Sequence, residues 1–505
     1  MSLIVAGGAL NVTPGAIQGE TLNTNYLDFA SGASDWAAQY LPEVMEKEAE
    51  VFGNRTVSGF LSQVGAEEPM SSDQVVWSEQ GRLHLAYTAD VTSLTAGATV
   101  AGGRLTIIDH IDTNAAYVAN THGIRPGDTV LVATTAGTLK CYVTDAANGS
   151  NVIDVAPYTQ TNLGSAGVTM VTGSENARVF VYGSEFVKGS AGRAMSNISS
   201  HVTYANKPII LKDYYEVSGS DSAQIGWVEV SGEDGQSGYF WYLKSAGETR
   251  SRFSDYLETA MLEGEWIGAN TAQGATAVGS SLVDGALAGA NTESGTQGLF
   301  AAVRDRGNAS GGITQASGSA ANLGEFDAII AEFDSQGAIE ENMLFLNRDA
   351  NLAIDDMLAS MWGNSTTGAT SYGVFNNSED MALNLGFSGF RRGSYDFYKS
   401  DMKYLNQKDA RGSINAMAAG TAGEIRGVFV PAGVSSVYDQ ALGRNLKRPF
   451  LHVRYRASQA DNRKYKSWVV GSVGSATSGN DAMEMHFLSE RCLVTQGANN
   501  FMLLN

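Results

Sequence analysis

The chain has 505 residues, of which 43% are hydrophobic, and it carries a formal net charge of −20. This length allows roughly two to four domains, at about 150 residues each. The acidic balance argues against non-specific binding to nucleic acid, because neutralising phosphates requires clustered Lys and Arg.

The two cysteines, Cys141 and Cys492, are too few for a disulfide framework or a cysteine-based metal cluster. Residues 1–15 contain a short apolar run without a preceding basic segment, so no secretory signal is expected. No apolar run approaches the length of about 18 residues that a membrane span requires. These features predict a soluble, non-secreted protein.

Residues 1–70 are loosely patterned, with short helices predicted at 25–40 and 43–52, and we expect an arm that lies over another part of the assembly. A two-stranded ribbon follows. Its outgoing limb is Ser72–Thr88 and its return limb is His201–Val217. The alternation of apolar and polar residues around Leu83–Tyr87 has the period of two that is typical of a strand.

A lone ribbon is only marginally stable in water, and its unpaired edges attract partners. We therefore expect another copy of the chain to cover it. The apolar side chains that alternation places on its surface are the predicted inter-subunit contacts: Trp77, Leu83, Leu85, Tyr204 and Ile210.

Between the two limbs, residues 91–187 read as a series of short strands separated by turn signals, which is typical of a small barrel or sandwich. The predicted strands are Arg104–Ile108, Ala115–Ala119, Thr129–Ala133, Leu139–Thr144, Val152–Val155, Val168–Val171 and Arg178–Tyr182.

After the ribbon, apolar residues recur at spacings of three and four over residues 236–264, which predicts a long amphipathic helix with a possible kink at Gly247. A Gly- and Ala-rich loop is expected over 268–322, with a short helix at 297–304. The remainder predicts a strand at 343–347, a helix from about Asp349, and strands at 425–430, 466–470, 482–488 and 492–495. The whole is α+β with mainly antiparallel strands.

The sequence contains no phosphate-binding loop, zinc-binding helix motif or nucleophile elbow. Asp109–Asp112 is read as a polar loop rather than a cation site, and the pairs Glu340–Glu341 and Asp355–Asp356 as solvated or helix-terminal carboxylates. No catalytic, cofactor-binding or metal-binding residue is predicted, and no enzymatic activity.

Two aromatic clusters, Tyr239–Tyr242 and Tyr395–Tyr398, suit a core or a subunit interface better than a sugar- or base-stacking site. The basic stretch Arg444–Arg456 is expected to pair with acidic residues of neighbouring subunits, with contact to nucleic acid as the weaker reading.

The order of these parts resembles the major capsid proteins of tailed bacteriophages, which share the Hong Kong 97 (HK97) fold. That fold runs from an N-terminal arm through an extended E-loop and a long spine helix into interleaved peripheral and axial domains. Residues 343–358 and 425–433 look like axial elements, and 489–505 is similar to the closing strands of the peripheral domain. The implied fold class is α+β and HK97-like. The implied segments are 1–70 for the arm, 71–90 with 188–235 for the E-loop, 91–187 for an inserted β-rich domain, 236–268 for the spine helix, and 269–505 for the peripheral and axial domains.

The resemblance implies self-assembly into hexamers and pentamers that form an icosahedral shell around double-stranded DNA. Its implied partners are other copies of the chain and virion proteins such as portal, scaffold or decoration proteins. DNA is held by enclosure, no membrane is involved, and the location is the virion after assembly in the host cytoplasm. Some members form covalent cross-links through a lysine. Lys207 and Lys212 lie on the return limb, but no partner is identifiable, and none is expected here.

Two other functions remain open from the sequence alone. A different structural array protein, such as a tail sheath, decoration or surface-layer subunit, shares the acidic, glycine-rich and β-rich character. A carbohydrate-active enzyme would use a carboxylate pair for acid–base chemistry, but no such pair stands out.

Overall fold

In the computed structural model the described part of the chain begins at Gly59 and ends at Asn505. Within this span the gaps are 62–65, 81–83, 96–101, 111–121, 147–150, 166, 174–176, 194–200, 221–229, 232–236, 239, 267–294, 311–322, 338, 364–388, 419–422, 433, 440–443 and 473–476. The chain divides into two units, Met1–Thr56 and Val57–Asn505. The first unit, which contains both helices predicted for the arm, lies outside the described residues.

The predicted ribbon is present at its base. Strand β2 (Val75–Gln80) pairs antiparallel with β9 (His201–Asn206), and Trp77 lies opposite Tyr204. The ribbon is shorter than expected at both ends. Beyond the return limb's Pro208, which has no N–H to donate to a ladder, strand β10 (Ile209–Ser218) pairs instead with β22 (Ala482–Thr495). The second half of the predicted return limb therefore belongs to another sheet.

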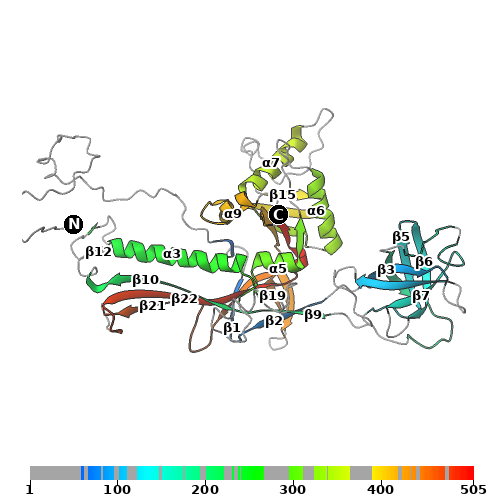
Figure 1. The fold of residues 1–505 in the computed structure, drawn as a ribbon, viewed down its shortest axis with the longest axis horizontal. Coiled ribbons are helices and arrows are strands. Elements are labelled where there is room, and N and C mark those ends of the chain that lie inside the picture. Colours follow the sequence, from blue (N-terminus) through cyan, green and yellow to red (C-terminus); the bar gives the residue numbers. More distant parts are fainter. Residues whose placement is uncertain are drawn as a thin grey trace, which may run out of the picture. The chain divides into compact units, whose positions relative to one another are not determined.

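The outgoing limb also ends early, because β3 (Ala86–Ser93) is a strand of the inserted domain. This domain is a closed barrel with the strand order β3-β4-β7-β6-β5-β8, so the expected barrel is confirmed over the alternative of a sandwich (Figure 1). Its other strands are β4 (Gly103–His110), β5 (Asp128–Thr134), β6 (Gly137–Ala146), β7 (Val152–Pro157) and β8 (Ala177–Ser184).

Two predicted strands of the barrel require comment. Residues 115–119 lie outside the described residues. The segment Val168–Val171 is not a strand; Met170 from this segment is buried against the apolar interior of the barrel, whose centre includes Leu105, Val130 and Val143. The apolar residues of this segment therefore pack against the barrel core without forming a strand.

The predicted long helix is α3 (Phe240–Glu263), which lies along one face of a five-stranded sheet (Figure 1). The sheet has the order β1-β20-β22-β10, and β21 (Lys466–Gly471) also pairs with β22. Strand β1 is Ala66–Met70 and β20 is Leu451–Arg456. Helix and sheet meet through Phe253, whose ring stacks on Phe487 at 5.8 Å between centroids.

A second, six-stranded sheet has the order β13-β23-β17-β14-β16-β15. Helices α6 and α7 pack on it through Phe326, Phe333 and Ile354, all fully buried. The bounds are β13 (Asn308–Ser310), β14 (Glu341–Leu346), β15 (Gly389–Arg392), β16 (Tyr395–Asp401), β17 (Gly427–Pro431), β23 (Met502–Leu504), α6 (Leu323–Gln336) and α7 (Arg348–Gly363).

The remaining elements are short. Helix α5 (Leu299–Arg306) matches the helix predicted at 297–304, and α8 (Lys403–Asn406) and α9 (Arg411–Met417) follow β16. Two further strand pairs are β11 (Val230–Ser231) with β12 (Ser237–Gly238), and β18 (Val434–Asp439) with β19 (Arg444–Pro449).

One apolar cluster joins α3, α5 and both sheets. It includes Met261 of α3, Leu299 of α5, Leu493 of the five-stranded sheet and Val428 of the six-stranded sheet, each nearly inaccessible to solvent. These elements therefore share a core. Among the described residues, no helix is long and apolar enough to cross a membrane.

Candidate assembly surface

The root of the β2–β9 ribbon is held by one arginine. Arg306, the last residue of α5, places its guanidinium 4.4 Å from the ring centre of Tyr204 and 5.5 Å from that of Trp77. Arginine stacks well on aromatic faces because its charge is spread over a plane. The contact joins both strands of the ribbon to α5.

Arg306 is a buried cation with a nearby anion. Burial lowers the pKa of its guanidinium, and the carboxylate of Glu79 on β2, 3.6 Å away, opposes that effect. The same carboxylate accepts hydrogen bonds from the Trp77 ring N–H and from the Gly497 backbone N–H, both at 2.9 Å. Glu79 therefore links the ribbon to the C-terminal segment as well.

A second anchor is Asn206, the last residue of β9, which is almost completely buried. Its amide group donates to the carbonyl oxygens of Leu493 and Gln297, at 2.6 and 3.0 Å. Its side-chain oxygen accepts from the backbone N–H of Gln297 and from the hydroxyl of Thr296, at 2.9 and 3.1 Å. A buried amide satisfied on both sides fixes its position closely.

Away from this root the ribbon is open. Among the described residues β2 and β9 pair only with each other, so each strand has an unpaired outer edge. Val76 on β2 is 61% exposed and Val202 on β9 is 44% exposed. The ribbon thus combines a rigid attachment with unpaired outer edges and one exposed valine on each face.

The five predicted contact residues lie in different environments. Trp77 is buried and Tyr204 is half-buried, both under Arg306 of the same chain. Leu85 packs against the barrel core, and Leu83 lies outside the described residues. Ile210 is 52% exposed, on the face of β10 opposite α3. An interface role for these residues stays a prediction.

The face of the five-stranded sheet opposite α3 carries a row of three rings. His486 of β22 lies between Tyr214 of β10 and Trp468 of β21, with centroid distances of 5.8 and 5.4 Å and nearly parallel planes. The register places these residues directly opposite one another across the three strands. The Nε2 of His486 lies 3.0 Å from a carboxylate oxygen of Glu484. This row leaves a flat aromatic surface on the outside of the sheet.

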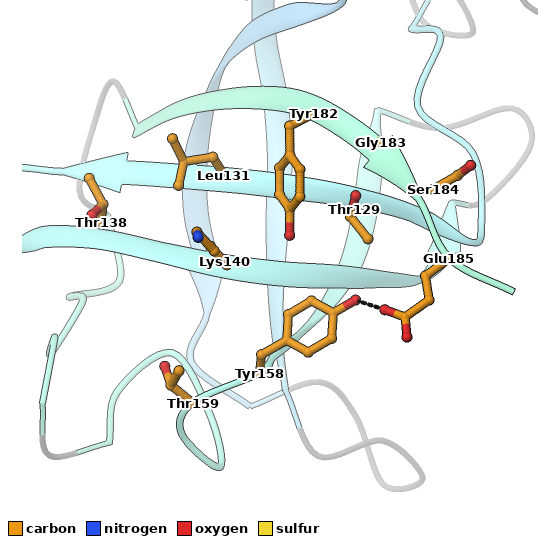
Figure 2. A pocket seen from close by; sticks show the side chains of 10 residues that line it. All are labelled: Thr129, Leu131, Thr138, Lys140, Tyr158, Thr159, Tyr182, Gly183, Ser184 and Glu185. Carbon is orange, nitrogen blue, oxygen red and sulfur yellow. Dashed lines mark hydrogen bonds between the residues drawn. The ribbon is translucent and has the colours of Figure 1, made fainter.

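The barrel carries an open groove of about 770 Å³ on its outer surface (Figure 2). The Tyr158 hydroxyl donates a 2.5 Å hydrogen bond to Glu185, which fixes one ring, and a bulge in the β5–β8 pairing accompanies the second ring, Tyr182. Burial and the Glu185 carboxylate raise the pKa of Tyr158. The Thr129 hydroxyl and Lys140 add polar groups, so the groove offers stacking and hydrogen bonding but no cluster of metal ligands. That statement covers the described residues only.

The aromatic cluster at 395–398 lies partly in the core, whereas three of the four residues in the acidic pairs are exposed, as expected for solvated carboxylates: Glu340, Glu341 and Asp356. Tyr395 and Phe397 are buried in the six-stranded sheet, as expected for core residues. Asp355 is also buried and forms an ion pair with Lys399, so it is not a solvated helix-face residue. The side chains of the Tyr239–Tyr242 cluster and of Asp109–Asp112 lie outside the described residues.

The described part of the basic stretch Arg444–Arg456 pairs within the chain rather than being left for a neighbour. Arg454 lies 2.7 Å from Glu68, and Arg456 forms ion pairs with Asp73 and Glu490. This corrects the expectation of inter-subunit pairing for these two arginines. Nearby acidic residues satisfy them because parallel pairing of β1 with β20 places Glu68 opposite Arg454.

Sequence reasoning missed the residues that build these surfaces. Arg306, Asn206 and His486 each act through partners that are far away in the sequence, and none belongs to a local motif. For one aromatic residue of the row, the sequence pattern does indicate a cross-strand contact. Tyr214 lies in a strand whose residues alternate between exposed and less exposed positions, and aromatic residues on strands pair favourably across strands.

No family model and no curated protein matches the sequence. Among solved structures, the chain is similar to the capsid structure of the cyanophage P-SCSP1u, with 8% identity, a TM-score of 0.39 and coverage of 98% of each chain. It is also similar to a structure from Microbacterium phage Oxtober96, with 7% identity, a TM-score of 0.37 and coverage of 93% of this chain and 97% of the other. A structure from Mycobacterium phage Ogopogo shares 11% identity, with a TM-score of 0.37 and coverage of 93% and 98%. The likeness to phage structures thus extends over most of the chain, at low sequence identity.

Proposed function

We propose that this chain is a major capsid protein, which self-assembles into the hexamers and pentamers of an icosahedral head shell enclosing double-stranded DNA. The ribbon carries the proposal. It is fixed at its root by Arg306 and Asn206, yet both its outer edges are unpaired among the described residues. An isolated two-stranded ribbon is marginally stable in water. A neighbouring copy that covers the ribbon supplies the missing contacts.

The rigid root gives this arrangement a mechanical use. A ribbon that pivoted freely would lose conformational freedom when it docked on a neighbour, and that loss would weaken each contact. Because the Arg306 and Asn206 contacts already hold its base, less freedom is lost on docking. Repeated over a closed symmetric shell, many modest contacts of this kind give a stable particle.

The proposed organisation follows the family resemblance. Residues 71–90 and 188–235 are assigned to the E-loop, 91–187 to the inserted domain and 236–268 to the spine helix, with the arm before and the peripheral and axial domains after. Within the E-loop segments β2 and β9 form the ribbon, while β3 belongs to the inserted barrel and β10 to the five-stranded sheet. The acidic chain encloses DNA without reading its sequence. Portal, scaffold or decoration proteins are the proposed virion partners, and the host cytoplasm is the site of assembly.

Negative-stain electron microscopy of the purified protein tests the proposal. Closed shells, or six- and five-membered rings, are the expected result. Helical tubes or flat lattices would instead identify another structural array protein. A protein that remains monomeric, with or without the scaffold of its own particle, would overturn assembly as its function.

A matched pair of variants links the assembly to the ribbon. Val76→Glu places a charge on the exposed ribbon surface, and Val171→Glu places the same charge on an equally exposed residue of the inserted domain, since both valines are 61% exposed. We expect V76E to stop shell formation while its circular dichroism spectrum matches wild type. V171E should assemble normally. Equal assembly of both variants would contradict a role for the ribbon.

Covalent cross-linking is not part of the proposal. Lys207 lies between β9 and β10, Lys212 lies within β10, and no acceptor for either is identifiable. Particles boiled in denaturant should therefore give monomer-sized bands on a gel. A ladder of covalent oligomers would contradict this expectation.

A further inference from the structure

We infer that strand β10 pairs antiparallel with β10 of a second copy of the chain, about a two-fold axis that passes beside Tyr214. This inference rests on the proposed self-assembly and specifies one contact within it. Such a contact is isologous, because each copy contributes the same strand.

The position of β10 makes the pairing possible. It is the terminal strand of the five-stranded sheet, and among the described residues it pairs only with β22 (Figure 1). The β10–β22 register runs over the whole strand without a bulge. Natural sheets usually protect such an edge with a proline, a bulge, a short strand or charged side chains. Over its 10 residues β10 has no proline and no bulge, and its charged residues are Lys212, Asp213 and Glu216.

The hydrogen-bonding pattern of β10 leaves backbone N–H and C=O groups directed away from β22, at the open edge of the sheet. Gly219, which continues the strand, donates its N–H to Asp481 on the β22 side. In an antiparallel pair the bonded residues alternate, so the odd-numbered residues face β22 and the even-numbered residues direct N–H and C=O groups outward. Consistent with this, the Tyr214 N–H is bonded only locally, to the side chain of Asp213 at 2.9 Å.

The side chains select a second copy as the partner. Lys212 and Glu216 lie two positions on either side of Tyr214, on the same exposed face, and neither forms an ion pair with another described residue. In a two-fold pairing centred on Tyr214, Lys212 of each copy lies directly opposite Glu216 of the other. Tyr214 lies opposite its own counterpart. Opposite charges and aromatic pairs are both favourable across strands.

The flanking positions fit the same register. Ile210, already a predicted contact residue, lies opposite Ser218 of the second copy, so no like charges face each other between the two copies of β10 on this face. The rows of rings from the two copies then become one continuous row, from Trp468 and His486 through the two Tyr214 rings. A partner strand of different sequence would match this order of charged and aromatic residues only by chance.

A cysteine at the axis tests the pairing directly. Directly opposed, hydrogen-bonded residues of an antiparallel pair have Cα atoms about 5.5 Å apart, which lies in the range that disulfides require. In assembled protein, Tyr214→Cys should give a disulfide-linked dimer under mild oxidation. The matched control is Tyr256→Cys, at a similarly exposed position on α3, which should stay monomeric on the gel. The native Cys141 and Cys492 are buried and do not interfere.

Charge reversal tests the register. Lys212→Glu and Glu216→Lys each bring like charges together twice in every pair, and we expect each to weaken the association about tenfold. The double variant K212E/E216K restores opposite charges and should recover wild-type association. Recovery in the double variant is not expected if each residue contacts an unrelated surface.

The outcomes separate this inference from the proposed function. Shells that form without a Y214C dimer, and without rescue in K212E/E216K, would overturn the β10 pairing and leave the capsid proposal standing. Y214C dimers in a protein that forms no shells would support the pairing and contradict the capsid proposal. Dimers formed equally by Y214C and Y256C would indicate random collision and overturn the pairing.

Discussion

The carboxylate of Glu258, near the C-terminal end of α3, accepts a 2.6 Å hydrogen bond from the backbone N–H of Phe60, which lies almost two hundred residues earlier. The N–H groups of Gly59 and Leu61 donate to the same carboxylate, at 2.6 and 3.2 Å. Three neighbouring N–H groups thus converge on one buried side chain. The contact fastens the segment that follows the N-terminal unit to the long helix.

Glu258 should make stability depend on pH. Burial raises the pKa of this carboxyl above its usual value, although the three N–H groups oppose the shift. A carboxyl with a raised pKa in the folded state contributes stability that is fully present below the unfolded pKa, about 4.5, and lost as pH rises through the folded pKa. We therefore expect the unfolding free energy of wild type to decrease relative to that of Glu258→Gln as pH rises above about 4.5. Urea denaturation at a series of pH values measures it.

The alanine variant supplies the control for this site. Glu258→Ala leaves three backbone donors without their acceptor, and we expect a loss of about 2–4 kcal/mol near pH 4.5, where the contribution of Glu258 is largest. E258Q keeps one oxygen acceptor and should lose less. A wild-type pH profile parallel to that of E258Q would show that Glu258 does not titrate in this range.

Arg306 should be far more important for stability than a surface arginine. Arg306→Ala leaves Glu79 without its nearest cation and removes the cover of Tyr204 and Trp77, which predicts a loss of about 3–5 kcal/mol. Arg306→Lys should recover only part of this, because an ammonium group cannot stack as a plane. Arg348 is the control: its ion pair with Asp401 is largely exposed, and its removal should cost about 1 kcal/mol or less.

Limited proteolysis gives the functional readout for the same variants. If Arg306 holds the ribbon root, R306A should be cleaved in the β2 and β9 segments much faster than R348A. Equal cleavage of the two variants would mean that Asn206 alone holds the ribbon in place.

Local patterns in the sequence predict a β-rich inserted domain and the helix α3, but they do not distinguish a barrel from a sandwich or identify strand partners that are distant in the sequence. The alternation around Leu85 looks the same whether the strand pairs in a ribbon or in a barrel. Strand β22 was expected as two strands, because Ser489–Arg491 interrupts its apolar run. These polar residues are buried in one continuous strand, where Glu490 pairs with Arg463 at 3.0 Å.

Helix α6 was missed although its signal was available. Phe326, Ile329, Ile330 and Phe333 recur at helical spacing directly after the Gly- and Ala-rich stretch, and three of them are buried. The candidate surface was harder to predict. Arg306 meets the ribbon only because α5 folds against β2 and β9, which are more than a hundred residues apart in sequence. Single-sequence patterns contain no information about such contacts.

The Lys399–Asp355 ion pair is buried on both sides and should behave as a unit. Lys399→Met removes the ammonium group from the buried carboxylate of Asp355, so we expect a loss of about 3–5 kcal/mol. Asp355→Leu leaves the ammonium group instead, with a similar loss. The double variant K399M/D355L should be more stable than either single variant, because both charges of the buried ion pair are then removed together. Urea denaturation of all four proteins gives the coupling energy, and additive losses would contradict pairing.

The two cysteines should be unreactive while the protein is folded. Burial raises the pKa of both the Cys141 and the Cys492 thiol to about 12, and neither forms a disulfide. Because the thiolate is the reactive form, a chromogenic thiol reagent at pH 8 should detect almost no free thiol in native protein and two per chain in denaturant. Cys141 lies in the barrel interior and Cys492 in the five-stranded sheet, so each reports on a different domain. Fast labelling of Cys141 alone in native protein would show that the barrel opens independently of the sheet.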